Sequence, residues 1–105
     1  MLNLNTPVEE HNLNGRKILV KRDDLMGDNN ILPPWGKMAG IDALLENLNP
    51  KYPLIHLAVN GSWSGWALSY LCKQRGIKFI YAYPPSKTYS EFILSKAKEN
   101  DCEFH

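Results

Sequence analysis

The strongest constraint on the fold is a regular alternation of two hydrophobic patterns along residues 37–105. Short apolar runs, which are typical of strands, are separated by segments in which apolar residues recur every three or four positions, as on one face of a helix. The expected strands are residues 54–59, 77–83 and 102–105, and the expected helices are residues 37–48, 66–75 and 88–100. Strands and helices that alternate in this way favour an α/β fold with a mostly parallel sheet.

The run Leu-Ile-His-Leu-Ala-Val at residues 54–59 is almost continuously apolar. Such a run is expected for a strand that is buried on both faces of a parallel sheet. We therefore expect a three-layer arrangement, with helices on both sides of the sheet. Gly76, which directly follows an expected helix, suits the left-handed backbone position that ends many helices.

The first 36 residues lack the alternation and are expected to form a strand and a loop that lead into the α/β unit. Residues 1–16 are expected to be irregular apart from an Asn-Gly turn, residues 17–21 to form a strand, and residues 22–36 to form a loop. The paired prolines Pro33 and Pro34 exclude a regular helix in that loop. The 105 residues are thus expected to make a single α/β region, 1–105.

Charge and composition argue against several classes of partner. Lys and Arg number 12 and Asp and Glu number 11, so the net charge of +1 gives no electrostatic footprint for nucleic acid or an anionic membrane. The chain has no apolar stretch near the length of about 20 residues that spans a bilayer, and residues 1–7 lack the basic and apolar regions expected of a signal peptide. Cys72 and Cys102 are expected to be free thiols in a reducing cytoplasm. The three histidines are scattered and show no zinc-ligand spacing.

Residues 60–65, Asn-Gly-Ser-Trp-Ser-Gly, lie between an expected strand and an expected helix. In open α/β sheets, ligands bind beyond the carboxyl ends of the strands. Backbone N–H groups at a helix N-terminus favour anions, and glycines allow close approach. The loop therefore predicts a phosphate or carboxylate site, although Ser62 or Ser64 also suits a simple helix N-cap. It is not a nucleophile elbow, because Trp63 occupies the central position that the motif reserves for serine.

Lys37 follows the rigid Pro-Pro-Trp-Gly loop and opens an expected helix. A lysine amine can form a Schiff base with a carbonyl cofactor, but lysines are also the commonest solvated surface residues, so both interpretations stay open. Trp63 and Trp66 suit either a ligand pocket or the core, because indole combines a large apolar area with one hydrogen-bond donor.

Four motifs occur in an order that resembles a known family. They are Thr6-Pro7, Lys21-Arg22-Asp23-Asp24-Leu25, Gly36-Lys37 and Ser62-Trp63-Ser64. Together they resemble the N-terminal part of pyridoxal-phosphate (PLP) enzymes of fold type II, which share the tryptophan synthase beta-like fold. The closest branch is the 1-aminocyclopropane-1-carboxylate deaminase / D-cysteine desulfhydrase family. The resemblance covers nearly the whole chain.

This resemblance implies pyridoxal 5'-phosphate as the cofactor and a deaminase or lyase activity on a small amino-acid substrate. Lys37 would be the Schiff-base lysine and Ser62 the active-site serine. The residues implied at the cofactor are Lys37, Asn60, Gly61, Trp63, Ser64 and Gly65.

The chain also departs from the family pattern. Gly36 and Trp63 stand where the family has asparagines, and an indole cannot make the hydrogen bond of the second asparagine to the PLP ring oxygen. The family's chains are longer, and their glycine-rich phosphate loop comes after the part that this chain matches. The 105 residues are therefore expected to be inactive alone and to need a complementing C-terminal chain or a homodimer. The alternative is a truncated or diverged, non-catalytic α/β module that binds a partner chain or a small anion.

Overall fold

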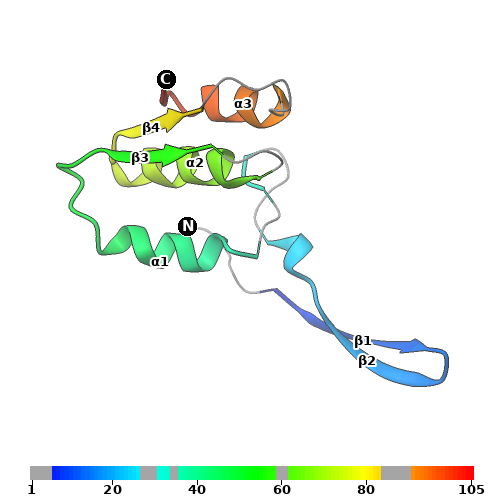
Figure 1. Ribbon diagram of the computed structural model, residues 1–105. Helices are drawn as coiled ribbons and strands as arrows, with labels where there is room; N and C mark the ends of the chain where they lie inside the picture. Colours follow the sequence, from blue (N-terminus) through cyan, green and yellow to red (C-terminus); the bar gives the residue numbers. More distant parts are fainter. Residues whose placement is uncertain (1–5, 27–30, 34–35, 59–61, 84–90) are drawn as a thin grey trace.

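The computed structural model describes residues 6–26, 31–33, 36–58, 62–83 and 91–105, which form a hairpin and an α/β unit (Figure 1). The hairpin consists of β1 (Val8–Leu13) and β2 (Arg16–Lys21), and the short 3-10 helix η1 (Asp23–Leu25) follows it. The α/β unit contains α1 (Met38–Glu46), β3 (Leu54–Leu57), α2 (Ser64–Arg75), β4 (Phe79–Ala82), α3 (Glu91–Lys98) and β5 (Glu103–Phe104). The predicted alternation of strands and helices is therefore confirmed.

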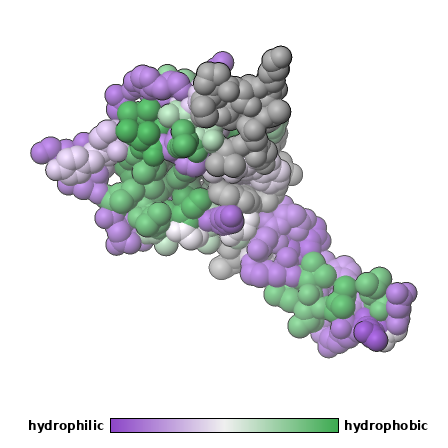
Figure 2. Space-filling model, viewed as in Figure 1, coloured by the Kyte–Doolittle hydropathy of each residue, from purple (hydrophilic) through white to green (hydrophobic). Residues whose placement is uncertain are grey.

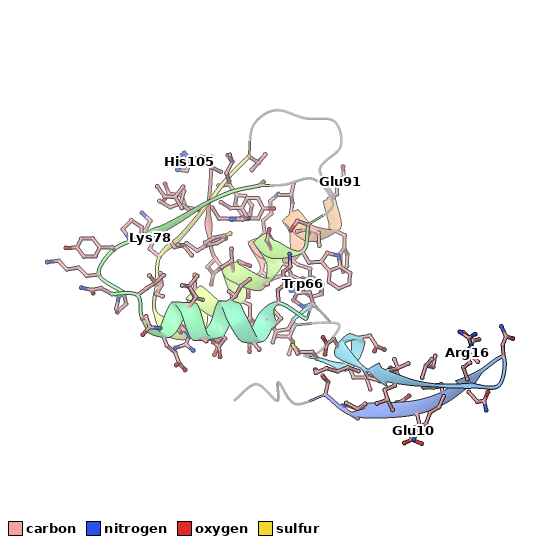
Figure 3. All side chains as sticks on the ribbon, turned by 60° about the horizontal axis from the view of Figure 1, so that its bottom comes forward. Glu10, Arg16, Trp66, Lys78, Glu91 and His105 are labelled. Carbon is pink, nitrogen blue, oxygen red and sulfur yellow. The ribbon has the colours of Figure 1, made fainter. Side chains whose placement is uncertain are left out.

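The hairpin contains a strand that the sequence did not predict. β1 lies in the stretch expected to be irregular, and it pairs antiparallel with β2 along its whole length. Asn14 and Gly15 form the turn with φ values of 51° and 76°, and positive φ at both central residues is what a type I′ hairpin turn requires. The hairpin extends away from the α/β unit (Figure 1), so that Glu10 and Arg16 are far from the helices (Figure 3).

The sheet of the α/β unit is parallel, with the strand order β3-β4-β5. Each strand is followed by its spatial neighbour, and right-handed crossovers in one direction place every connecting helix on the same face. α2 lies between α1 and α3 and packs on β4 (Figure 1). The described helices thus cover one face, and the second helical layer of the expected three-layer arrangement is not found among the described residues. The strand β3 is not buried on both faces either, because Ile55 and Leu57 are 66% and 65% exposed.

The core lies between the sheet and this helical layer. Its buried members include Met38, Leu45, Ala67, Leu71, Cys72, Phe79, Tyr81 and Ala97. Cys72 and Cys102 are free thiols, as expected, and burial raises the pKa of the Cys72 thiol to about 11, which keeps it protonated and unreactive. Gly76 adopts the predicted left-handed conformation, with φ 68°, and its N–H closes the last turn of α2.

Some apolar residues that were expected on the buried faces of the helices are exposed. Leu44 and Leu48 at the end of α1 are 61% and 37% exposed, and Phe92 at the start of α3 is 55% exposed. The apolar stripe is therefore wider than the surface that the described chain covers. No helix within the described residues is long and apolar enough to cross a membrane.

The first turn of α2 lies directly against β4. A Cβ atom added to Gly65 would lie 1.6 Å from Cε2 of Tyr81, and Tyr81 is only 3% exposed. The ring of Tyr81 is packed among Phe79, Tyr83 and Phe104, so it has little room to move. Glycine at position 65 is therefore what allows this close approach of helix and strand.

We expect Gly65→Ala to destabilise the fold by about 1–3 kcal/mol, because the added methyl group overlaps a buried ring. Gly40→Ala in α1 is the matched control, since nothing lies within 4 Å of its added Cβ and alanine gains about 1 kcal/mol over glycine in a helix. Urea unfolding followed by circular dichroism measures both. Equal stabilisation by the two substitutions would contradict the close packing.

Candidate functional site

The starts of α1 and α2 lie at the same end of the sheet, beyond the carboxyl end of β3 (Figure 1). The indole Nε1 of Trp66 donates to the carbonyl oxygen of Ile31 at 2.8 Å, which ties the segment before α1 to the first turn of α2. The fold thus brings the predicted residues Lys37 and Ser62 to one end of the molecule. Asn60 and Gly61, which were also predicted at the cofactor, lie outside the described residues.

Lys37 occupies the N-cap position of α1, where its carbonyl oxygen accepts the N–H of Ile41 at 3.0 Å. The residue is exposed. The structure explains why the preceding residue, Gly36, is a glycine. A Cβ atom at this position would lie 2.8 Å from Oδ2 of Asp23. The missing side chain at position 36 therefore lets η1 approach the residue before Lys37.

Ion pairs hold residues 21–24, Lys-Arg-Asp-Asp, in place between the hairpin and the segment that leads to Lys37. Arg22 donates from Nε and Nη2 to the two carboxylate oxygens of Asp24, at 2.8 and 2.7 Å, and from Nη1 to Glu9 at 2.9 Å. Asp23 accepts from the Lys21 ammonium and from the Thr6 hydroxyl. These donors lower the pKa of Asp23, so the carboxylate that approaches Gly36 stays ionised.

Three side chains form a continuous line of hydrogen bonds beneath the start of α2. Ser62 Oγ donates to Ser64 Oγ at 2.9 Å, and Ser64 Oγ lies 2.8 Å from Nε2 of His56 on β3. The backbone N–H of Ser64 donates to Ser62 Oγ at 3.1 Å. The expectation that Ser62 or Ser64 is the N-cap is wrong, because Trp63 holds that position without a side-chain cap. Ser62 precedes the cap and Ser64 is the first helical residue.

The half-buried side chain of His56 lies beside two aromatic rings. Its ring lies 6.2 Å from the Phe79 ring and 6.0 Å from the Tyr81 ring, centroid to centroid. Desolvation by burial lowers the pKa of His56 below its ordinary value, so the imidazole is neutral at pH 7 and available as an acceptor. Ser64 is 8% exposed, which leaves little room for water to compete for this hydrogen bond.

The two tryptophans of this region have different environments. Trp66 is 2% exposed and packs edge-on against Phe92, with ring centroids 5.5 Å apart, so it belongs to the core. Trp63 is 38% exposed at the start of α2. Of the two, Trp63 is therefore the one whose indole is open to a ligand at this end of the sheet.

His56 is the site residue that sequence reasoning missed. It was considered only as a metal ligand, and no group of three or more His, Cys, Asp or Glu side chains gathers within the described residues. The available signal was a polar residue inside the apolar run 54–59. Alternation along β3 turns its side chain toward α2, together with Leu54, and away from the exposed Ile55 and Leu57.

The fold and the site together define a parallel α/β protein with a lysine and a hydroxyl-imidazole cluster at the carboxyl end of its sheet. No family model matches the sequence. The chain is similar to the glycyl-dTMP PLP-dependent decarboxylase of Pseudomonas phage M6, with 39% identity over 85 residues. That match covers 79% of this chain and 29% of the phage protein, so the chain spans less than a third of the length of this relative. The comparison supports a distant relationship to a PLP-dependent enzyme.

The lowered pKa of His56 predicts a specific dependence of stability on pH. Between the folded pKa and the unfolded value of about 6.5, the unfolded chain binds more protons, so the free energy of unfolding falls as the pH falls through this window. His56→Phe should remove that part of the pH dependence. His11→Phe should keep it, because His11 is an exposed residue of the hairpin, away from the site, whose side chain is hydrogen-bonded to Glu9. Urea unfolding at several pH values measures the difference, and identical profiles for wild type and His56→Phe would contradict the burial of a neutral imidazole.

Proposed function

We propose that this chain is the lysine- and serine-bearing part of a PLP-dependent enzyme that acts on a small amino acid. The observation that carries the proposal is that α1 and α2, whose starts adjoin Lys37 and Ser62, both begin at the carboxyl end of one parallel sheet (Figure 1), in a chain that is 39% identical over 85 residues to a PLP-dependent decarboxylase. Bound PLP would act as an electron sink for the reacting amino acid. The order of the motifs favours deamination or β-elimination as the reaction.

The residues present fit this cofactor in part. Lys37, an exposed residue at the start of α1, would hold the cofactor carbonyl through its amine. The start of α2 offers backbone N–H groups and the positive end of a 12-residue helix to a phosphate or carboxylate, and Ser62 adds a hydroxyl. Trp63 offers only its ring face and one N–H donor, so it would stack against the cofactor or substrate rather than accept a hydrogen bond.

The chain's own residues suggest how a substrate would be bound. The carboxylate of an amino acid would lie against the first turn of α2, where the helix dipole favours negative charge. The half-buried Ser62 would then lie beside the substrate and take part in proton transfer.

A non-catalytic α/β module is the second candidate. It is favoured by Trp63, which stands where the resembled family has an asparagine. Such a module would use the start of α2 to bind a small anion and would leave Lys37 without a covalent partner.

Covalent capture of PLP distinguishes these two functions. We expect PLP, followed by borohydride reduction, to leave the phosphopyridoxyl group on Lys37 at several times the level found on Lys51, an exposed lysine in the loop after α1. Peptide mass spectrometry measures the label at each site. Lys37→Arg keeps the charge and should abolish the preferential labelling. Equal labelling of Lys37 and Lys51 would favour the non-catalytic module.

We further propose that the rest of the enzyme is supplied by a complementing chain that docks on β3. In the described part of the chain β3 pairs only with β4, and its free edge and outer face carry the exposed Ile55 and Leu57. Apolar side chains of β3 and α1 form a continuous surface there, in which Leu44, Leu48 and Ile55 line a groove (Figure 2).

The two edges of the sheet differ in a way that favours β3 as the docking edge. Glu103 on the opposite edge strand, β5, is ion-paired with Lys78 at 2.8 Å, and charged edges resist the pairing of further strands. β3 contains no Lys, Arg, Asp or Glu, and its one titratable residue, His56, is neutral at pH 7. More than two thirds of the phage relative lies outside the match, which is enough chain to cover this face.

Co-expression with the unmatched part of the phage relative tests this docking. We expect a complex on size exclusion with light scattering, and we expect Leu57→Lys to abolish it, because burying an unpaired charge in an apolar interface is costly. Leu19→Lys on the hairpin is the control, since Leu19 is also 65% exposed. A homodimer of the chain alone that Leu57→Lys disrupts would assign the face to a second copy instead, and loss of the complex in both variants would contradict docking at β3.

A further inference from the structure

We infer that His56 is the terminal proton acceptor of a relay that runs from Ser62 through Ser64. The inference deepens the proposed function and rests on it for the identity of the substrate, an amino acid that gives up a proton. The relay itself is made only of side chains of this chain. His56 would act through the two hydroxyl groups, so it is a positioning and proton-holding residue without direct contact to substrate.

The direction of the relay follows from the number of donors and acceptors. A serine hydroxyl has one proton to donate. Ser62 Oγ accepts the backbone N–H of Ser64 at 3.1 Å and directs its own proton to Ser64 Oγ at 2.9 Å. Within the described residues, the remaining acceptor for the Ser64 proton is Nε2 of His56 at 2.8 Å. The imidazole must then carry its proton on Nδ1.

The middle of the relay is its most buried part. Ser62 and His56 are both half-buried, whereas Ser64 between them is 8% exposed. The rings of Phe79 and Tyr81 lie beside the imidazole. Desolvated hydrogen bonds in a line polarise one another. Ser62 lies at the end of the sheet where a substrate would lie, so a proton taken from a substrate passes through the buried Ser64 to the half-buried imidazole.

Nothing charged opposes this role among the described residues. The side chains that face His56 are Phe79 and Tyr81 from β4, Ser64 from α2 and the apolar residues that line its groove with α1. Desolvation is the one cause that lowers its pKa. The imidazole is therefore neutral and ready to accept at pH 7, and once protonated it gives the proton back readily, as a reversible acid and base requires.

The transfer consists of three proton movements that occur together. Ser62 Oγ takes the proton that the substrate loses, the original Ser62 proton moves to Ser64 Oγ, and the original Ser64 proton moves to Nε2 of His56. Both serines remain neutral hydroxyl groups, His56 becomes an imidazolium, and the substrate carries the electron pair. The reverse sequence returns a proton to the product.

The relay can be tested in the chain without PLP, so its failure is distinguishable from failure of the proposed function. Nitrogen-15 NMR of the imidazole should show the proton of neutral His56 on Nδ1. Ser62→Ala should shift the pKa of His56 although Ser62 does not touch the ring, and Ser64→Ala should remove that coupling. A proton on Nε2 in the wild-type chain, or a His56 pKa that is insensitive to Ser62→Ala, would overturn the relay.

Modification by phenylmethylsulfonyl fluoride supplies a second readout. Ser62 Oγ bonds to sulfur, fluoride leaves, and the Ser62 proton passes through Ser64 to His56. General-base assistance contributes about 10²–10⁴-fold, so we expect His56→Phe to slow the labelling of Ser62 by at least about 10²-fold and to abolish its titration with His56. His11→Phe is the control and should label at the wild-type rate. Unchanged labelling of Ser62 in folded His56→Phe would also overturn the relay.

Discussion

The close approach of α2 to β4, at Gly65 and Tyr81, is the contact on which the candidate site depends. With 1.6 Å between the Tyr81 ring and a hypothetical Cβ of residue 65, only glycine allows the first turn of α2 to lie on the sheet. This placement holds Ser64 within 2.8 Å of His56. It also seats Trp66 so that its indole reaches the carbonyl oxygen of Ile31 and anchors the segment before Lys37. The absence of a side chain at Gly65 therefore allows the hydrogen bond between Ser64 and His56. Through Trp66 it also allows the contact that anchors the loop before Lys37.

Sequence reasoning located the elements of the α/β unit because each has a strong local signal. Gly76, for example, marks the end of α2 without reference to the rest of the chain. The strand β1 was missed because its sequence, Val-Glu-Glu-His-Asn-Leu, has few apolar residues, and its stability comes from pairing across the Asn14-Gly15 turn. The Asn-Gly turn itself was recognised, and its two positive φ values define the hairpin.

The errors about burial have a different origin. An apolar run such as residues 54–57 indicates that both faces of a strand tolerate burial, but it does not say which chain segment covers them. The strand order β3-β4-β5, together with right-handed crossovers, places the described helices on one face. Ile55 and Leu57 are consequently apolar and exposed at once. The candidate site follows the same logic: Lys37 and Ser62 were found from motifs, whereas His56 acquires its role only through a strand register that no local pattern contains.

The exposed face and the candidate site are two consequences of one geometry. Strands that all run in one direction bring their carboxyl ends, and therefore Ser62 and the start of α2, to a single edge of the sheet. Among the described residues, the edge of β3 is unpaired and Ile55 and Leu57 on its outer face are exposed. A site at the end of an open sheet is enclosed on one side only, by the strands and helices that carry its residues. A chain segment that covered β3 would lie next to the start of α1 and α2, so docking there would at once bury the apolar face and supply a second wall for a ligand at Lys37. The lowered pKa of His56 already reflects a partly dry interior, and further exclusion of water would strengthen each hydrogen bond from Ser62 inward.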